Sequence, residues 1–386
     1  GCLQPITLSR HRCISACLAE QALNLFIKHI FLGRVFMAER NVRESEQPVN
    51  YAMLSLFQYL ASILVILVHC QRLFENEVLH FTQKSMFGRM AVPFFLISSA
   101  FMLKSSLAKK QDMKLYIKRI LKQYLLWSGI YVPYALAYFW TLPLPKHYAP
   151  LALLAGLLYI GLCYQLWYIP AFLLGLLLVH YVYRKWGARK TGIFLLLLYV
   201  MGSIETYYAY FSNSWLTQSF DVYAKVFFTT RNGFFYTPIF IYLGYLLYDY
   251  QQSSIFRKDY GKKLFLSGLL LLLDGWIVFI HQGIDKNFFL ALPLFALFLL
   301  NWILRTRNGQ NWHLYHLKEL SVLYFFLHPI FIESSFYLLQ KTDFAKWQQG
   351  RIVFLLTLLL THLSAEVILL ARKCLFLKQR LTKGIG

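Results

Sequence analysis

From residue 51 onward, long apolar runs alternate with short polar segments. The clearest run is Tyr51 to Cys70, whose about 20 mostly apolar residues match the length that a helix needs to cross a ~30 Å hydrocarbon core. Further runs of similar character lie at 88–103, 120–140, 166–183, 191–209, 232–249, 264–281, 288–304, 320–339 and 352–371. The pattern predicts an all-α, polytopic transmembrane helical bundle of about ten spans.

One more apolar run, at 150–163, is shorter than a span, and runs of about 14 residues are more often re-entrant or interfacial. The basic residues support that interpretation. The segment 104–122 is rich in lysine and arginine, which marks it as cytoplasmic. If 150–163 does not cross the membrane, every later basic cluster also lies inside. We therefore expect a re-entrant or interfacial helix there, and a multi-pass protein of the cell (plasma) membrane with both termini cytoplasmic.

Composition agrees with a protein whose main partner is the lipid bilayer. Hydrophobic residues make up 58% of the chain, and the mean hydropathy is +0.48, which excludes a soluble domain of this length. The net charge of +22 lies in short loops between apolar runs, so it is a topology signal, and no nucleic acid partner is expected. The six cysteines lack metal-ligand spacing, so no metal is expected.

The chain divides into three parts. Residues 1–50 are polar in places and form an N-terminal extension. Either 22–36 is an interfacial amphipathic helix, or residues 1–36 precede a start at Met37 and do not belong to the native protein. Residues 51–372 form the membrane domain, and 373–386 form a basic cytoplasmic tail.

The predicted topology places many polar residues at the outer ends of their helices. A water-filled cavity would satisfy such groups, whereas lipid would not. These residues are His69, Arg89, Gln165, Trp167, Glu205, Arg231, Asn232 and His281.

His69 is the first candidate for chemistry. It lies 11 residues after Gln58, and eleven steps of ~100° bring both side chains to one face, ~16 Å apart. A neutral histidine facing a wet cavity can take a proton from a hydroxyl. The alternative is a histidine that caps the helix C-terminus and contacts interfacial water.

The other candidates also have two interpretations. Arg89 and Arg231, the latter followed by Asn232, are either anion clamps in the outer cavity or arginines that extend to the headgroups. Trp167 is either a substrate contact or an aromatic-belt anchor.

Three more positions involve groups inside predicted spans. Asp274 and His328 either bind substrate or pair within the bundle. His362 and Glu366 are spaced i, i+4, so we expect them to pair with each other.

Several motifs in order resemble the acyltransferase 3 family. They are the first span with its terminal histidine, RMAVPFF (89–95), YIKRILKQYLLW (116–127), LWYIP (166–170), RNGFFYTPIFIYLGYLL (231–247) and SVLYFFLHP (321–329). The resemblance covers about 51–372. Within the family it is greatest to the branch that contains the membrane half of the vancomycin-resistance serine racemase, which has an acidic residue where Asp274 stands.

The resemblance implies a membrane-embedded O-acyltransferase, an enzyme that transfers groups other than aminoacyl groups. Acetyl-CoA or another acyl-CoA on the cytoplasmic side would be the donor, and an extracytoplasmic hydroxyl of a cell-envelope glycan or lipid would be the acceptor. His69 matches the family's catalytic histidine, whereas Gln58 stands where the family has an arginine. The implied catalytic residues are His69, Arg89 and Arg231, and the implied substrate-binding residues are Gln58, Trp167, Asn232, Asp274 and His328.

The alternative is an amino-acid transport module. The serine racemase branch implies a membrane half that takes up L-serine, and the same outer cavity would then bind a zwitterion. Arg89 or Arg231 would contact the carboxylate, and Asp274 or Glu205 would contact the amine. The short tail after the last span favours a stand-alone acyltransferase.

Overall fold

The computed structural model describes residues 49–383, with side chains as far as Cys374. The described part of the chain is helical and contains no strand, so the predicted all-α class is confirmed. Six of its helical segments are long and apolar enough to cross a membrane, as expected of a multi-pass membrane protein. The expectations for the extension, including the helix at 22–36, lie outside the described residues.

The longer helices account for all ten predicted apolar runs. They are α2 (Tyr51–His69), α4 (Ala91–Ala108), α5 (Met113–Thr141), α7 (Tyr168–Gly202), α10 (Thr237–Tyr250), α12 (Tyr260–Ile280), α13 (Leu292–Arg305), α14 (Tyr315–Leu339) and α15 (Lys346–Lys383). The shorter ones are α3 (Glu77–Phe81), α6 (Ala149–Ala155), α8 (Ile204–Tyr207), α9 (Trp215–Phe227) and α11 (Ser254–Arg257), with π turns at Thr82–Phe87 and Gly156–Ile160.

Some boundaries differ from the prediction. Two predicted runs join in α7, which is interrupted at Gly187 by a backbone with φ 72° and ψ 176°. The run at 232–249 becomes helical only at Thr237, because the Asn232 side chain accepts bonds from the Phe234 and Phe235 amides and holds a turn there. Helix α9 was not predicted, since its 13 residues lie between apolar runs.

The basic loops of the bundle meet at one end, which we call the basic end. Lys104 at the end of α4 pairs with Asp249 of α10 at 3.2 Å, and Tyr183 of α7 donates to the same carboxylate at 2.6 Å. Asn50, just before α2, donates to the carbonyl of Thr306, just after α13, at 2.8 Å. The predicted grouping of these loops on one side is therefore present in the fold.

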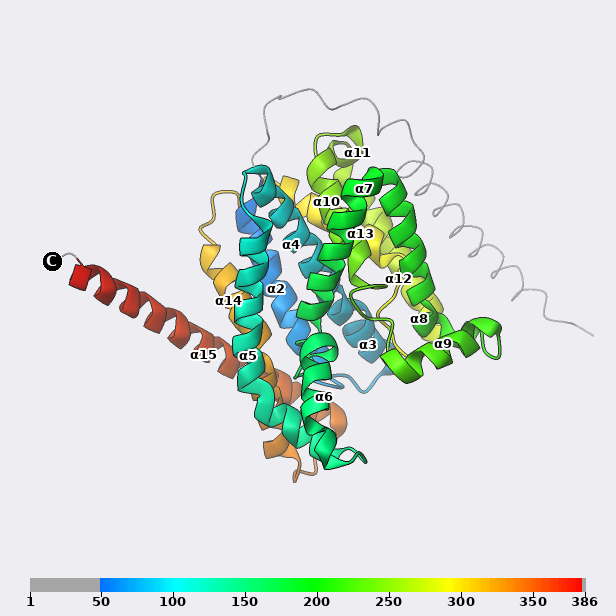
Figure 1. The fold of residues 1–386 in the computed structure, drawn as a ribbon, viewed down its shortest axis with the longest axis vertical. Helices are drawn as coiled ribbons and strands as arrows, with labels where there is room; N and C mark the ends of the chain where they lie inside the picture. Colours follow the sequence, from blue (N-terminus) through cyan, green and yellow to red (C-terminus); the bar gives the residue numbers. More distant parts are fainter. Residues whose placement is uncertain (1–48, 384–386) are drawn as a thin grey trace, which may run out of the picture.

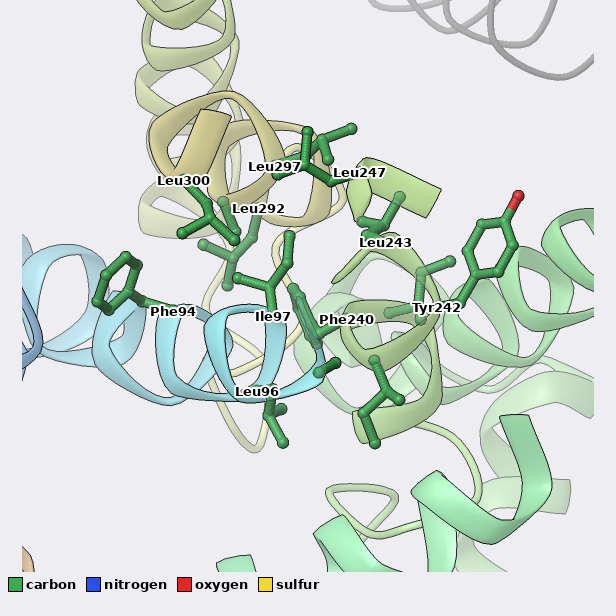
Figure 2. Close-up of a cluster of buried hydrophobic side chains, with 14 of the residues drawn as sticks. Phe94, Leu96, Ile97, Phe240, Tyr242, Leu243, Leu247, Leu292, Leu297 and Leu300 are labelled. Carbon is green, nitrogen blue, oxygen red and sulfur yellow. The ribbon is translucent and has the colours of Figure 1, made fainter. Parts of the chain in front are cut away.

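Helix α10 lies at the centre and organises the core. Apolar side chains of α4, α10 and α13 interdigitate, among them Ile97, Phe240 and Leu297, none of which exposes any surface (Figure 2). Gly244 permits a close approach of α10 to α4, since a Cβ there would lie 2.5 Å from the Ile97 carbonyl oxygen of α4. Close packing of this kind fixes α4, which carries Arg89 just before its first residue.

Helix α6 and its π turn are too short to cross a hydrocarbon core by themselves. It lies at the lower end of the bundle, and α7 rises above it (Figure 1). The 12 residues of α6 and its π turn extend only ~18 Å, less than a hydrocarbon core. The irregular residues 161–167 separate the two helices, and non-helical backbone within a membrane protein is tolerated where it lines a cavity.

Candidate active site

His69 is the last residue of α2 and lies among aromatic rings from two other elements. Its ring centroid is 4.5 Å from that of Tyr164, in the irregular segment before α7. It is 5.7 Å from the ring centroid of His328 in α14, and the two imidazoles are stacked at 24°. The imidazole of His69, the candidate base, therefore packs against side chains of the protein.

A polar hollow opens on one side of His69. Its volume is about 630 Å³. The polar side chains that line it are those of His69, Gln71, Tyr164, Glu333, Tyr337, Gln340 and Gln349. Amides, phenols and one carboxylate are groups that exchange hydrogen bonds with hydroxyls.

An apolar cavity of about 240 Å³ lies on the other side of His69. It extends between α2, α4, α5, α7 and α14 toward the basic end, as far as Tyr116 near the start of α5. Most of its lining is apolar, as Val65 and Phe95 illustrate, with Ser99 and Gln165 among the few polar groups. His69 is thus the residue that the polar hollow and the apolar cavity share.

The segment 161–167 presents two of the predicted residues to the apolar cavity. Gln165 and Trp167 both line it. Gln165 is 3% exposed, and neither atom of its amide has a hydrogen-bond partner. Gly161 makes the turn possible, because its φ is +80° and a Cβ there would lie 2.5 Å from the Trp167 amide nitrogen. A buried amide without partners is a costly feature that a bound ligand would satisfy.

Arg89 is held at the opposite end from the basic loops. It donates to Asn287 Oδ1 at 2.6 Å and pairs with Asp285 at 3.6 Å, both in the irregular segment before α13. Its Nε is buried and has no partner. The charges of Arg89 and Arg231 both act on His69, although neither arginine lines the two cavities at His69, so their shared site with His69 stays a prediction.

Arg231 lies with its guanidinium carbon 4.7 Å from the centre of the Trp167 ring, a cation–π contact. The loop that carries it is fixed by Glu205, which is 3% exposed. The Glu205 carboxylate accepts bonds from the Thr229 hydroxyl, the Thr230 hydroxyl and the Thr230 amide, at 2.6–2.9 Å. The Glu205 carbonyl also accepts from the Ile284 amide at 3.0 Å. One residue therefore joins the two loops that bear Arg231 and the partners of Arg89.

Two predicted substrate-binding residues are engaged by the protein itself. The Asn232 amide donates to Tyr223 at 2.8 Å and caps its own turn. Asp274 accepts bonds from the Tyr207 hydroxyl and, at 2.8 Å, from the Ala291 amide. Neither lines the cavities at His69, so their predicted contact with substrate stays a prediction.

Gln58 is buried on the same stripe of α2 as Val65 and His69, and its Oε1 has no partner. His281 is exposed and contacts Tyr210, with ring centroids 4.9 Å apart. Gln58 therefore stays a candidate for a ligand contact deeper in the bundle, whereas His281 lies apart from the cavities at His69.

His328 is fully buried and has a defined tautomer. Its Nδ1 lies 2.8 Å from the Tyr324 carbonyl oxygen. Because a carbonyl oxygen only accepts, Nδ1 carries the proton and the neutral ring presents Nε2 as an acceptor. That Nε2 is buried without a partner, in the ring that stacks on His69. His328 therefore offers one free acceptor atom close to the candidate base.

The expected pairing of His362 with Glu366 is wrong. His362 Nδ1 is 2.9 Å from the Tyr324 hydroxyl, and Glu366 pairs with His316 at 2.6 Å. Both partners belong to α14, so tertiary packing of α14 on α15 prevails over the i, i+4 contact, which contributes only ~0.2–0.5 kcal/mol.

Sequence reasoning missed Tyr164 and the partners of Arg89. Tyr164 is an ordinary aromatic in an apolar stretch, and no pattern distinguishes it. Burial raises the pKa of its phenol, so Tyr164 stays protonated and can donate a hydrogen bond. Asp285 is a carboxylate in a short loop, and its pairing with Arg89 depends on the fold. No group of three or more His, Cys, Asp or Glu that could hold a metal occurs among residues 49–374.

Comparison with known proteins identifies the family of the chain. The acyltransferase 3 family, an acyltransferase domain, matches residues 52–367. The serine/alanine racemase of Enterococcus gallinarum is 28% identical over 344 residues, which cover 84% of this chain and 45% of that protein. An amino-acid racemase of Enterococcus faecalis is 27% identical over 68% of this chain and 37% of its own length, and a second is 26% identical over 85% and 47%.

The chain thus spans less than half the length of these curated relatives. No solved structure matches it at a significant level. The family match covers well over half of the sequence and includes α2 with His69, the irregular segment 161–167 and α14 with His328. This membrane protein therefore belongs to the acyltransferase 3 family.

Proposed function

We propose that this protein is a membrane-embedded O-acyltransferase. It moves an acyl group, expected to be acetyl, from an acyl-CoA at the basic end onto a hydroxyl of a cell-envelope glycan or lipid at the other end. The observation that carries the proposal is the position of His69 between an apolar cavity and a polar hollow. A thioester and a hydroxyl acceptor can then approach one imidazole from opposite sides.

The proposed reaction needs only groups near His69. The imidazole takes the proton of the acceptor hydroxyl while its oxygen bonds to the thioester carbonyl carbon. The carbon–sulfur bond then breaks, and the thiolate leaves with the proton that His69 returns. General base catalysis by a positioned histidine contributes about 10²–10⁴-fold.

His328 and the two arginines have supporting roles in this scheme. His328 packs its ring against His69 and keeps a free Nε2, so we assign it the positioning of the His69 imidazole. Arg89 and Arg231 add positive charge that stabilises the oxyanion. Gln165 and Trp167 line the route of the acyl group, and the unpartnered Gln165 amide would contact the donor.

The scheme requires the basic end to face the cytoplasm, as the positive-inside rule predicts. With ten crossings, and with α6 not counted as one of them, both termini would lie on that side. A cysteine-labelling experiment on intact cells, with single cysteines placed at Lys258 and Lys341, tests this. Labelling of the first by an impermeant reagent would contradict the orientation.

The direct test of the proposed function is His69→Ala. Membranes that contain the protein would be supplied with labelled acetyl-CoA, and label in the envelope fraction would be measured. We expect at least a hundredfold loss of transfer. His281→Ala is the matched control. His281, like His69, follows or ends a helix at the end of the bundle opposite the basic end, but it is exposed and lies outside both cavities. Unchanged transfer by a folded His69→Ala protein would rule the function out.

A second candidate is amino-acid transport. Two points favour it: the relatives are named as racemases of serine, alanine or other amino acids, and Gln58 stands where the resemblance to the family implies an arginine, whose charge would help to bind acyl-CoA. The free Nε atoms of Arg89 and Arg231 would meet a carboxylate. Uptake of labelled L-serine into vesicles without any acetyl transfer would select this function in place of the first.

A further inference from the structure

Helix α9 lies at the end of the bundle that is opposite the basic end. It follows α8 and runs across the direction of α7 at the edge of the fold (Figure 1). The next helix agrees with this position, because α10 begins at Thr237 and reaches the basic end at Asp249, the partner of Lys104. The proposed reaction uses no side chain of α9.

One face of α9 is packed on the protein. Thr217 and Phe220 are buried, and the ring centroid of Phe220 lies 5.8 Å from that of Tyr208. At the end of the helix, the Tyr159 hydroxyl donates to the Phe227 carbonyl at 3.0 Å. These contacts fix the rotation of α9 about its own axis, so the directions of its other side chains are defined.

An outer face of α9 carries a row of exposed apolar side chains, which we call the apolar stripe. Its members, Trp215, Val222 and Val226, are 73%, 65% and 66% exposed. At ~100° per residue, both valines lie within ~20° of Trp215 around the helix, whereas Phe220 lies ~140° away. A row of large apolar side chains in contact with water is unfavourable, and exposed apolar patches mark interaction surfaces.

Polar side chains border the apolar stripe on the flank that faces away from the packed side. Gln218, Asp221 and Lys225 are exposed there, at ~60–120° from Trp215. Around α9, a packed face, an apolar stripe and a polar flank therefore follow one another. A helix in a membrane interface meets protein, acyl chains and water in this way. The charges of Asp221 and Lys225 cancel, so anionic lipids gain no advantage over neutral ones.

The lipid-facing surface of α12 leads to the same place. Leu272, Trp276 and Ile280 are exposed on one side of α12, which is apolar and long enough to cross a membrane. The Tyr210 hydroxyl donates to the Ile277 carbonyl at 2.7 Å. This bond joins the chain just before α9 to the last turn of α12. Lipid that covers the end of α12 therefore reaches the level at which α9 begins.

We propose that α9 is an interfacial helix that docks on the lipid leaflet opposite the basic end, with its apolar stripe at the boundary between headgroups and acyl chains. Its partner is the lipid surface, with no requirement for anionic headgroups. Helix α9 ends at Phe227, three residues before Thr230, whose amide bonds to Glu205. Docking therefore fixes the level of the Arg231 loop relative to the leaflet. The helix would dock equally in an acyltransferase and in a transporter, so its test is independent of the proposed function.

The test measures the depth of nitroxide spin labels by electron paramagnetic resonance, with the full chain in phosphatidylcholine nanodiscs. Val222→Cys and Val226→Cys place a label on the apolar stripe, and Lys225→Cys, on the polar flank of the same turn, is the matched control. The unsubstituted chain, labelled in the same way, supplies the signal of the native cysteines for subtraction. Oxygen concentrates in acyl chains and a nickel chelate stays in water. We therefore expect the ratio of oxygen to nickel collisions to be several-fold higher at 222 and 226 than at 225.

Each possible result bears on the docking of α9. A several-fold higher ratio that stays the same when anionic phosphatidylglycerol is added would support it. Equal ratios at all three positions would show that the apolar stripe faces water, and would overturn it. Few collisions with either reagent, together with spin–spin broadening between copies, would show that a second chain covers the stripe and would also overturn it. The two stripe variants report separately, so a loss of folding in one, seen in thermal unfolding, leaves the other to decide.

Discussion

Replacing Glu205 by alanine should loosen the loop that carries Arg231. The carboxylate accepts three bonds through Oε2, from the Thr229 hydroxyl, the Thr230 hydroxyl and the Thr230 amide. The Thr230 hydroxyl keeps a second partner, the Gly202 carbonyl, at 2.8 Å. The Thr230 amide loses its acceptor inside the protein, and a buried donor without a partner costs about 1–3 kcal/mol.

The total cost follows from these contacts. Loss of a buried, hydrogen-bonded carboxylate is typically worth about 3–5 kcal/mol, because its partners stay behind unsatisfied. We therefore expect Glu205→Ala to lower the melting temperature by on the order of 5–10 °C. Glu205→Gln should have a smaller effect, since the amide oxygen still accepts from the Thr230 amide.

The assay combines thermal unfolding in detergent with hydrogen–deuterium exchange of the peptide 228–236. Glu366→Ala is the control, because that carboxylate pairs with a half-exposed His316, and exposed pairs contribute only about 0–1 kcal/mol. Exchange of 228–236 should accelerate at least tenfold in Glu205→Ala and stay constant in the control. Equal melting temperatures for the two variants would refute the account of Glu205 as the residue that fixes the loop.

Three more predictions concern the cavities and the packing beside them. Substitution His328→Phe keeps a buried ring but removes the acceptor, so acetyl transfer should fall at least tenfold without a change in melting temperature. Ser99→Phe adds five heavy atoms to a cavity of about 240 Å³. Because each added atom takes up less than the ~30 Å³ share of a water, the added volume is on the order of 100 Å³. It should lower kcat/KM for acetyl-CoA at least tenfold, whereas Ser99→Ala should not. Gly350→Ala places a Cβ 2.0 Å from the Arg72 carbonyl oxygen and should cost about 1–3 kcal/mol in thermal unfolding, in contrast to Gly261→Ala, which meets nothing within 4 Å.

Hydrophobic periodicity and loop charge were sufficient to predict much of this fold. Each apolar run became a helix because in lipid the backbone must satisfy its own hydrogen bonds. The basic loops came together as expected, with contacts such as Lys104–Asp249. The ends of helices were less predictable. Asn232 delays α10 through side-chain bonds to two amides, a local competition that periodicity does not record.

The candidate site was predictable only in part, for a related reason. His69, Arg89 and Arg231 stand out because an ionisable group near lipid is costly and needs a partner, and such groups are visible in a sequence. The groups that surround these three residues cannot be recognised in the sequence. Tyr164, Asp285 and Glu205 act through contacts between segments far apart in the chain, such as the bond from Thr230 to Glu205. Asp274 is the opposite case. Its carboxylate is equally costly in lipid and equally easy to recognise in the sequence, but the Tyr207 hydroxyl and the Ala291 amide satisfy it within the bundle. An intramembrane charge therefore predicts that a partner exists, and only the fold decides whether that partner is the protein or a ligand.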